Sequence, residues 1–97
     1  MQNTLEYTAY NGMKFYIVYI EALEKEPEED SPMMSIVFTT HPEIIAEAKA
    51  DAECNGGAVP VGCKDLLVDS VDNITRQLDY VAHAVKTGDS WYECLKV

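Results

Sequence analysis

The stretch Tyr10-Asn11-Gly12-Met13 joins two runs of residues that are rich in aromatic and β-branched side chains. Asn-Gly tolerates the positive φ angles of a two-residue type I′ turn, so the sequence predicts a β-hairpin with that turn. The expected strands are residues 4–10 and 13–23. The second strand would place Phe15, Ile17 and Tyr19 on one face, and Tyr16, Val18 and Ile20 on the other. Apolar residues on both faces indicate a central strand covered on both sides, or a face used for association.

The segment that follows the hairpin predicts a third strand and then a helix. Residues 24–32 form a polar loop with two prolines, and residues 33–39 are expected to complete an antiparallel meander. Thr40 and Glu43 have the spacing of a capping box, which predicts a helix start. The helix should end near Cys54, because Gly56 and Gly57 permit a left-handed C-cap. Its expected inner face consists of Ile45, Ala48 and Ala52, with Ile44 at the side.

A second helix is indicated by residues 64–87, which contain no glycine or proline. Apolar residues recur there at steps of three and four: Leu67, Val71, Ile74, Leu78, Val81 and Val85. The start remains open, because Ser70 could cap a shorter helix and leave residues 66–68 extended. Gly88 ends the helix, and residues 91–97 are expected to form a fourth strand.

The predicted element order is therefore β-β-β-α-α-β, within a single acidic domain that spans residues 1–97. The fold class is α+β, with a four-stranded, mainly antiparallel sheet and two helices packed on one face.

The composition limits the partners that this chain can have. It carries 17 acidic and 7 basic residues, so its formal net charge is −10. Such a charge disfavours direct binding to nucleic acid or to an anionic membrane, and it favours a basic partner. The three cysteines are an odd number without close spacing, and no signal peptide is recognised. These observations predict a cytoplasmic protein with free thiols.

The acidic side chains are the main candidates for partner binding. Glu43, Glu47 and Asp51 recur every four residues along the first expected helix, and Asp65, Asp69 and Asp72 lie on the polar face of the second. The polar loop adds Glu24, Glu26, Glu28, Glu29 and Asp30. Evenly spaced carboxylates can stand in for phosphates, so the surface is interpreted as one that binds a basic, nucleic-acid-binding protein or complex. The simpler interpretation is that these are the solvated faces of amphipathic helices.

In size and charge alone, the chain is similar to inhibitors encoded by phages and mobile elements, such as anti-CRISPR and anti-restriction proteins. No motif assigns it to a family, so no residues are carried over. The alternative is a homo-oligomeric accessory protein, a homodimer for example, in which Tyr16, Val18, Tyr19 and Ile20 form the contact and the charge only maintains solubility.

Enzymatic chemistry ranks third among the interpretations. The glycines fit no phosphate-binding loop, and the histidines and cysteines lack the paired spacing of a zinc site. We therefore expect no catalytic residues, no metal and no cofactor.

Overall fold

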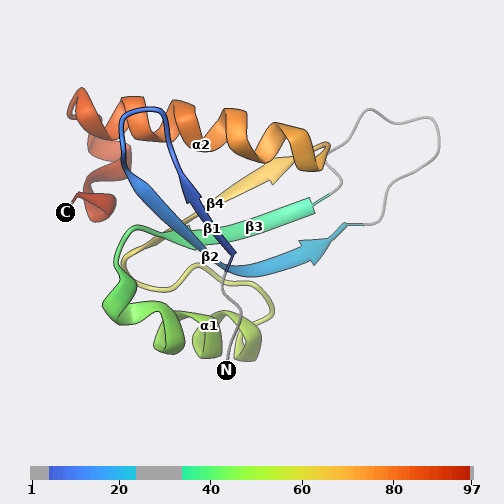
Figure 1. The fold of residues 1–97 in the computed structure, drawn as a ribbon. Helices are drawn as coiled ribbons and strands as arrows, with labels where there is room; N and C mark the ends of the chain where they lie inside the picture. The colour runs from blue at the N-terminus through green and yellow to red at the C-terminus, as the bar shows by residue number, and fades with distance from the viewer. Residues whose placement is uncertain (1–4, 24–33, 97) are drawn as a thin grey trace.

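The structure, a computed structural model, describes residues 5–23 and 34–96 and contains one antiparallel sheet in the order β1-β2-β3-β4 (Figure 1). The strands are β1 Leu5–Thr8, β2 Lys14–Ala22, β3 Met34–Thr39 and β4 Cys63–Val68. Helix α1 (Ile45–Cys54) follows the 3-10 turn η1 (Pro42–Ile44), and helix α2 (Val71–Lys86) precedes η2 (Ser90–Leu95). The α+β class and the four-stranded antiparallel sheet with two helices are confirmed.

The β1–β2 hairpin is confirmed, but its predicted turn type is wrong. Ala9 N donates to Met13 O at 2.8 Å, and Gly12 N donates to Ala9 O at 2.9 Å, so three residues form the loop. Gly12 has a φ of +86°, whereas no described residue other than glycine has a positive φ. Asn11 instead uses its side chain, which accepts from Met13 N and donates to Ala82 O of α2. The loop is therefore tied to α2, which a type I′ turn does not require.

The predicted position of the fourth strand is wrong. The fourth strand is β4, which pairs with β3 from Cys63↔Thr39 to Val68↔Met34 and lies between the two helices in sequence. Residues 91–95 of that expected strand belong instead to η2, where the Asp89 side chain accepts from Trp91 N at 2.9 Å and favours a turn, and Val97 lies outside the described residues. The physical reason is that β3 needs a hydrogen-bonding neighbour on its second side, and β4 supplies it.

The alternative start of the second helix is confirmed. The Ser70 side chain accepts from Asn73 N, and Val71 is the first residue of α2. Leu67, the first residue of the predicted apolar stripe, therefore lies on a strand and is exposed.

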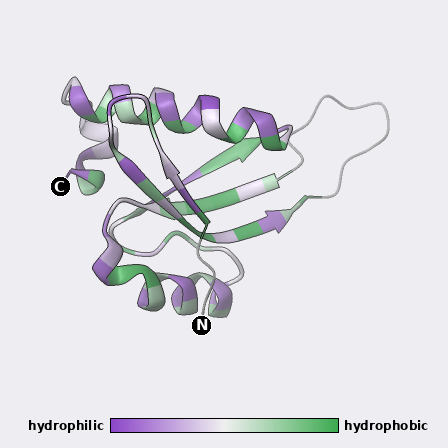
Figure 2. Cartoon of the chain, viewed as in Figure 1, coloured by the Kyte–Doolittle hydropathy of each residue, from purple (hydrophilic) through white to green (hydrophobic). Residues whose placement is uncertain are grey.

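The two helices cover opposite faces of the sheet, so the prediction that both pack on one face is wrong (Figure 1). Phe38 of β3 packs in a cluster with Leu78 of α2, whereas its neighbour Val37 packs in a second cluster with Ala48 of α1. Successive side chains of a strand point to opposite faces, and β3 is apolar on both. Figure 2 shows this apolar sheet between the two helices.

A β-bulge in β2 changes the predicted division of its faces. The register with β3 shifts between Ile17 and Tyr19. Ile17 packs on the α2 side, while Val18 and Tyr19 both pack on the α1 side. Tyr19 therefore does not share a face with Phe15 and Ile17, because the bulge interrupts the alternation.

Candidate functional site

The predicted acidic residues of the first helix lie on one exposed side of the molecule. Glu43 belongs to η1, and Glu47 and Asp51 lie one turn apart in α1. Neither Glu47 nor Asp51 forms an ion pair with another described residue, whereas a Glu43 carboxylate oxygen lies 3.8 Å from Nδ1 of His41. The helix buries Ala48 and Ala52, whereas Glu43, Glu47 and Asp51 are exposed.

A hollow of about 250 Å³ separates α1 from the loop at residues 58–62. It is lined by Ile44, Glu47, Ala48, Asp51, Pro60 and Val61. Val61 is 97% exposed. An almost fully exposed apolar side chain therefore lies beside the carboxylates of Glu47 and Asp51, neither of which pairs with a described residue. Val61 was not predicted as a site residue, because its exposure depends on how the loop folds back against α1. We call Glu43, Glu47, Asp51 and Val61 the acidic α1 surface.

The second predicted acidic row does not exist as a helical face. Asp65 lies on β4, and Asp69 lies in the turn before α2, where its Oδ1 accepts from Nδ2 of Asn73 at 3.0 Å. Only Asp72 belongs to α2, in its first turn. The row was predicted from a helix starting at residue 64, and it is broken because the helix starts later. Glu24, Glu26, Glu28, Glu29 and Asp30 lie outside the described residues.

The four residues predicted for self-association do not form one exposed patch. Val18 is 4% exposed and packs beneath α1, and Tyr19 packs partly against the same cluster. Tyr16 lines a separate hollow, and Ile20 is exposed. Val18 is inaccessible because helix α1 covers the face of β2 on which it lies.

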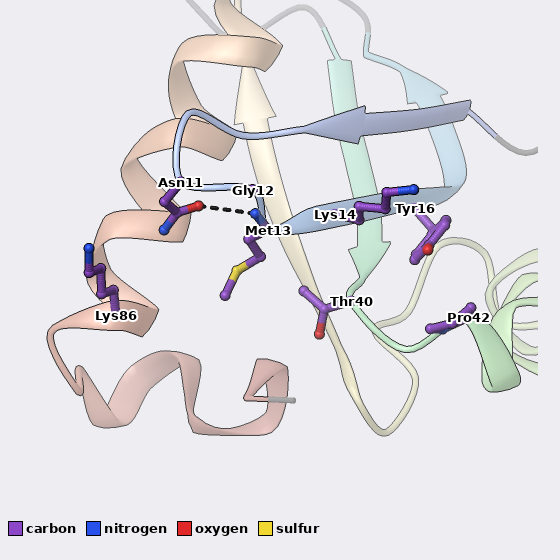
Figure 3. A pocket seen from close by; sticks show the side chains of 8 residues that line it. All are labelled: Asn11, Gly12, Met13, Lys14, Tyr16, Thr40, Pro42 and Lys86. Atoms are coloured by element: carbon purple, nitrogen blue, oxygen red, sulfur yellow. Dashed lines mark hydrogen bonds between the residues drawn. The ribbon is translucent and has the colours of Figure 1, made fainter.

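The hollow at Tyr16 has a volume of about 620 Å³ and lies where the β1–β2 loop, the end of β3 and the end of α2 meet (Figure 3). Its lining residues are Asn11, Gly12, Met13, Lys14, Tyr16, Thr40, Pro42 and Lys86. Lys14 Nζ lies 3.3 Å from a carboxylate oxygen of Glu6, and Lys86 forms no ion pair within the described part of the chain. We call this site the lysine hollow.

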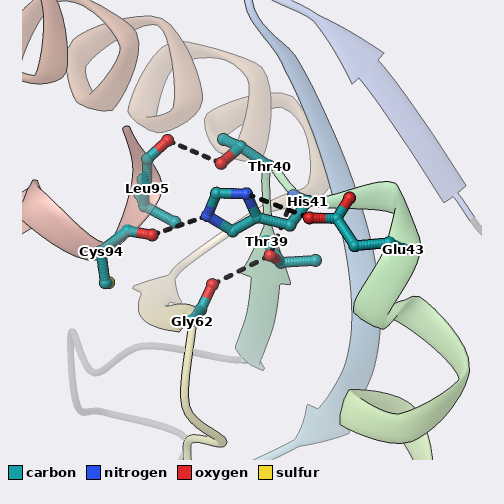
Figure 4. A network of polar contacts seen from close by, with 7 residues as sticks. All are labelled: Thr39, Thr40, His41, Glu43, Gly62, Cys94 and Leu95. Atoms are coloured by element: carbon teal, nitrogen blue, oxygen red, sulfur yellow. Dashed lines mark hydrogen bonds and ion pairs between the residues drawn. The ribbon is translucent and has the colours of Figure 1, made fainter. Parts of the chain in front are cut away.

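A polar network fastens the C-terminal segment to the start of η1 (Figure 4). The Thr40 hydroxyl donates to Leu95 O at 2.7 Å, and Nε2 of His41 lies 2.7 Å from Cys94 O. The predicted capping box is therefore wrong: neither η1 nor α1 has a side-chain cap, and the Thr40 hydroxyl is engaged elsewhere. The network joins the C-terminal segment to the end of β3, and Nε2 of His41 already has Cys94 O as its hydrogen-bond partner.

The three cysteines are free: Cys54 and Cys94 are exposed, and Cys63 is buried. Burial raises the pKa of the Cys63 thiol and is the largest effect. A hydrogen bond with Thr39 lowers this pKa, and the nearby Cys94 raises it. A raised pKa disfavours the nucleophilic thiolate.

Two further kinds of site were sought in the described residues. No group of three or more histidine, cysteine, aspartate or glutamate side chains there could hold a metal ion. None of the helices at residues 5–23 and 34–96 combines the length and apolar character needed to cross a membrane.

Comparisons with known proteins add no functional assignment. No protein-family model, no curated protein and no solved structure matches this chain.

Proposed function

We propose that this chain is a non-enzymatic, protein-binding domain whose acidic α1 surface engages a basic partner. The observation that carries the proposal is the position of Val61, nearly fully exposed beside the unpaired carboxylates of Glu47 and Asp51. Protein interfaces combine an apolar centre with polar groups at the rim, and this surface offers both. A partner lysine or arginine could place its aliphatic stem on Val61 and its charge toward the carboxylates.

The excess of acidic residues supports rapid, salt-sensitive association with such a partner. If the partner's basic surface also binds nucleic acid, the domain would compete with that nucleic acid. The three free thiols fit the reducing cytoplasm that we infer as its location.

The test is affinity capture from a bacterial or phage-infected lysate at about 50 mM and about 500 mM salt, a range over which screening changes strongly. The variant pair is Glu47→Lys with Asp51→Lys. Its matched control is Glu21→Lys with Glu53→Lys, which changes the net charge equally at two other exposed residues. We expect a captured basic protein to be lost with the first pair and retained with the control. Equal loss with both pairs would show that only net charge matters.

A second candidate function, self-association, is favoured by exposed aromatic side chains at a different place from the one predicted. Trp91 of η2 is 68% exposed, with its ring centroid 4.4 Å from Nζ of Lys64, and Tyr80 of α2 is also exposed. Tryptophan and tyrosine are enriched at interface centres. Sedimentation equilibrium distinguishes the candidates: a dimer that dissociates in Trp91→Ser, and persists in Glu47→Lys with Asp51→Lys, would favour self-association.

A further inference from the structure

We propose that the lysine hollow binds a small organic anion with an apolar body, such as an amphipathic carboxylate. This inference is independent of the proposed function, because the hollow and the acidic α1 surface share no residue. Its volume of about 620 Å³ falls within the range of small-molecule sites, which is about 300–1,000 Å³.

The lining of the lysine hollow is positively charged, whereas the chain as a whole is negatively charged. Acidic residues outnumber basic ones by 17 to 7, yet the lining contains two lysines and no acidic residue. Lys14 and Lys86 come from distant parts of the sequence and lie on opposite sides of the hollow (Figure 3). Lys14 forms an ion pair with Glu6, whereas Lys86 has no ion-pair partner among the described residues. Lys14 and Lys86 therefore give the rim of the hollow a local positive charge on a protein whose net charge is negative.

The other lining groups indicate which part of the ligand contacts each side. Met13 offers apolar surface between the two lysines, and Tyr16 and Pro42 add apolar surface beyond Lys14 (Figure 3). The Thr40 hydroxyl already donates to Leu95 O. Asn11 accepts from Met13 N through Oδ1 and donates one Nδ2 hydrogen to Ala82 O.

The donors left for a ligand are the two ammonium groups, the second Nδ2 hydrogen of Asn11 and the Tyr16 hydroxyl, which makes no hydrogen bond within the described part of the chain. Lysine ammonium groups act as flexible point charges, so they attract an anionic head group by its charge and do not impose a fixed geometry on it. The apolar body of the ligand would lie over Met13, which lies between the two lysines.

The experiment uses the full chain and three probes. Anilinonaphthalene sulfonate, an apolar anion, reports binding by its fluorescence, and octanoate and its uncharged analogue octanamide serve as competitors. We expect octanoate to displace the dye and octanamide to displace it much less. Amide NMR shifts on adding octanoate should centre on residues 11–16, 40–42 and 86.

The lysine variants test the cationic rim directly. Lys14→Gln with Lys86→Gln should weaken octanoate binding by about fivefold to tenfold, because exposed ion pairs each contribute a modest factor. The matched control, Lys49→Gln with Lys96→Gln, removes the same charge elsewhere and should change binding by less than about twofold. Equal effects of the two pairs, equal displacement by octanamide, absence of binding, or NMR shifts outside the hollow would each overturn the proposal.

Discussion

The hydroxyl of Thr40 donates a 2.7 Å hydrogen bond to the backbone carbonyl of Leu95, which lies 55 residues further along the chain. Thr40 is 4% exposed and Leu95 is fully buried, so water cannot replace either partner. This bond, with that of His41 to Cys94 O, holds the C-terminal segment against the end of β3.

Replacing Thr40 with valine should therefore destabilise the protein. Valine has nearly the same shape but leaves the Leu95 carbonyl without its partner, which costs about 1–3 kcal/mol. Thr8→Val, at an exposed position of β1, should change the free energy of unfolding by less than about 0.5 kcal/mol. Urea denaturation of both variants measures the difference, and equal values would contradict a structural role for the bond.

The glycine pair after α1 offers a matched test of close packing. A Cβ atom on Gly57 would lie 2.9 Å from Cε1 of Tyr19, whereas one on Gly56 meets nothing within 4 Å. Both have positive φ angles, +64° at Gly56 and +90° at Gly57, so alanine is strained at either position. Gly56→Ala should cost about 1–2 kcal/mol, and Gly57→Ala about 1–3 kcal/mol more because of overpacking. Thermal denaturation that ranks the two variants equally would contradict the contact with Tyr19.

The cap of α2 gives a prediction whose sign depends on where the helix begins. Because Ser70 accepts from Asn73 N as the cap, Ser70→Ala should destabilise the protein by about 1 kcal/mol. Ser70→Asp should retain most of the stability, since aspartate is an equally good cap. If α2 started near residue 64, Ser70 would be interior, and alanine would stabilise the helix instead. Denaturant titration of the two variants therefore tests the helix boundary.

Alkaline pH should weaken the attachment of β1 to α2. The Tyr7 hydroxyl donates to Oδ1 of Asp79 at 3.1 Å. Desolvation, followed by the hydrogen bond to Asp79 and its negative charge, raises the Tyr7 pKa above 10.0. Folding therefore favours the neutral phenol. This stabilisation is fully present below about pH 10 and is lost as the pH rises through the raised pKa.

The check is the free energy of unfolding measured between about pH 8 and about pH 11. Tyr7→Phe should be less stable than the unmodified chain at neutral pH, because it lacks the hydrogen bond. It should also lose less stability as the pH rises. Tyr92→Phe is the companion variant, since desolvation also raises the Tyr92 pKa. Identical pH profiles for Tyr7→Phe and the unmodified chain would rule out the contribution of Tyr7.

Local signals in the sequence predicted the features that local chemistry controls. The hairpin at Asn11-Gly12 and the end of α1 at Cys54 both follow from glycines that adopt positive φ angles. The turn type was wrong because Asn11 is fixed by a hydrogen bond to Ala82, a residue of a distant helix. A helical segment does follow Thr40, but the predicted capping box is absent because the Thr40 hydroxyl donates to Leu95 O instead.

The fourth strand shows where periodicity misleads. Leu67 and Val71 continue the helical spacing of Ile74 and Leu78, yet both are exposed. Whether Cys63–Val68 forms a strand is decided by pairing with β3, which no local pattern records. The candidate sites depend even more on tertiary structure, because residues near positions 11, 40 and 86 meet only after folding. Glu47 and Asp51 do lie together, because both belong to α1 and are one turn apart, whereas Glu43 precedes that helix in η1.

Strand β3 has a consequence for how the molecule unfolds. Its Ile36, Val37 and Phe38 are all fully buried, and the strand contributes side chains to the clusters beneath both helices. Detachment of either helix would therefore expose apolar side chains of β3, the strand against which the other helix also packs. The two layers form one cooperative unit rather than two separable ones, and the amide protons of β3 should be the last in the described chain to exchange with solvent.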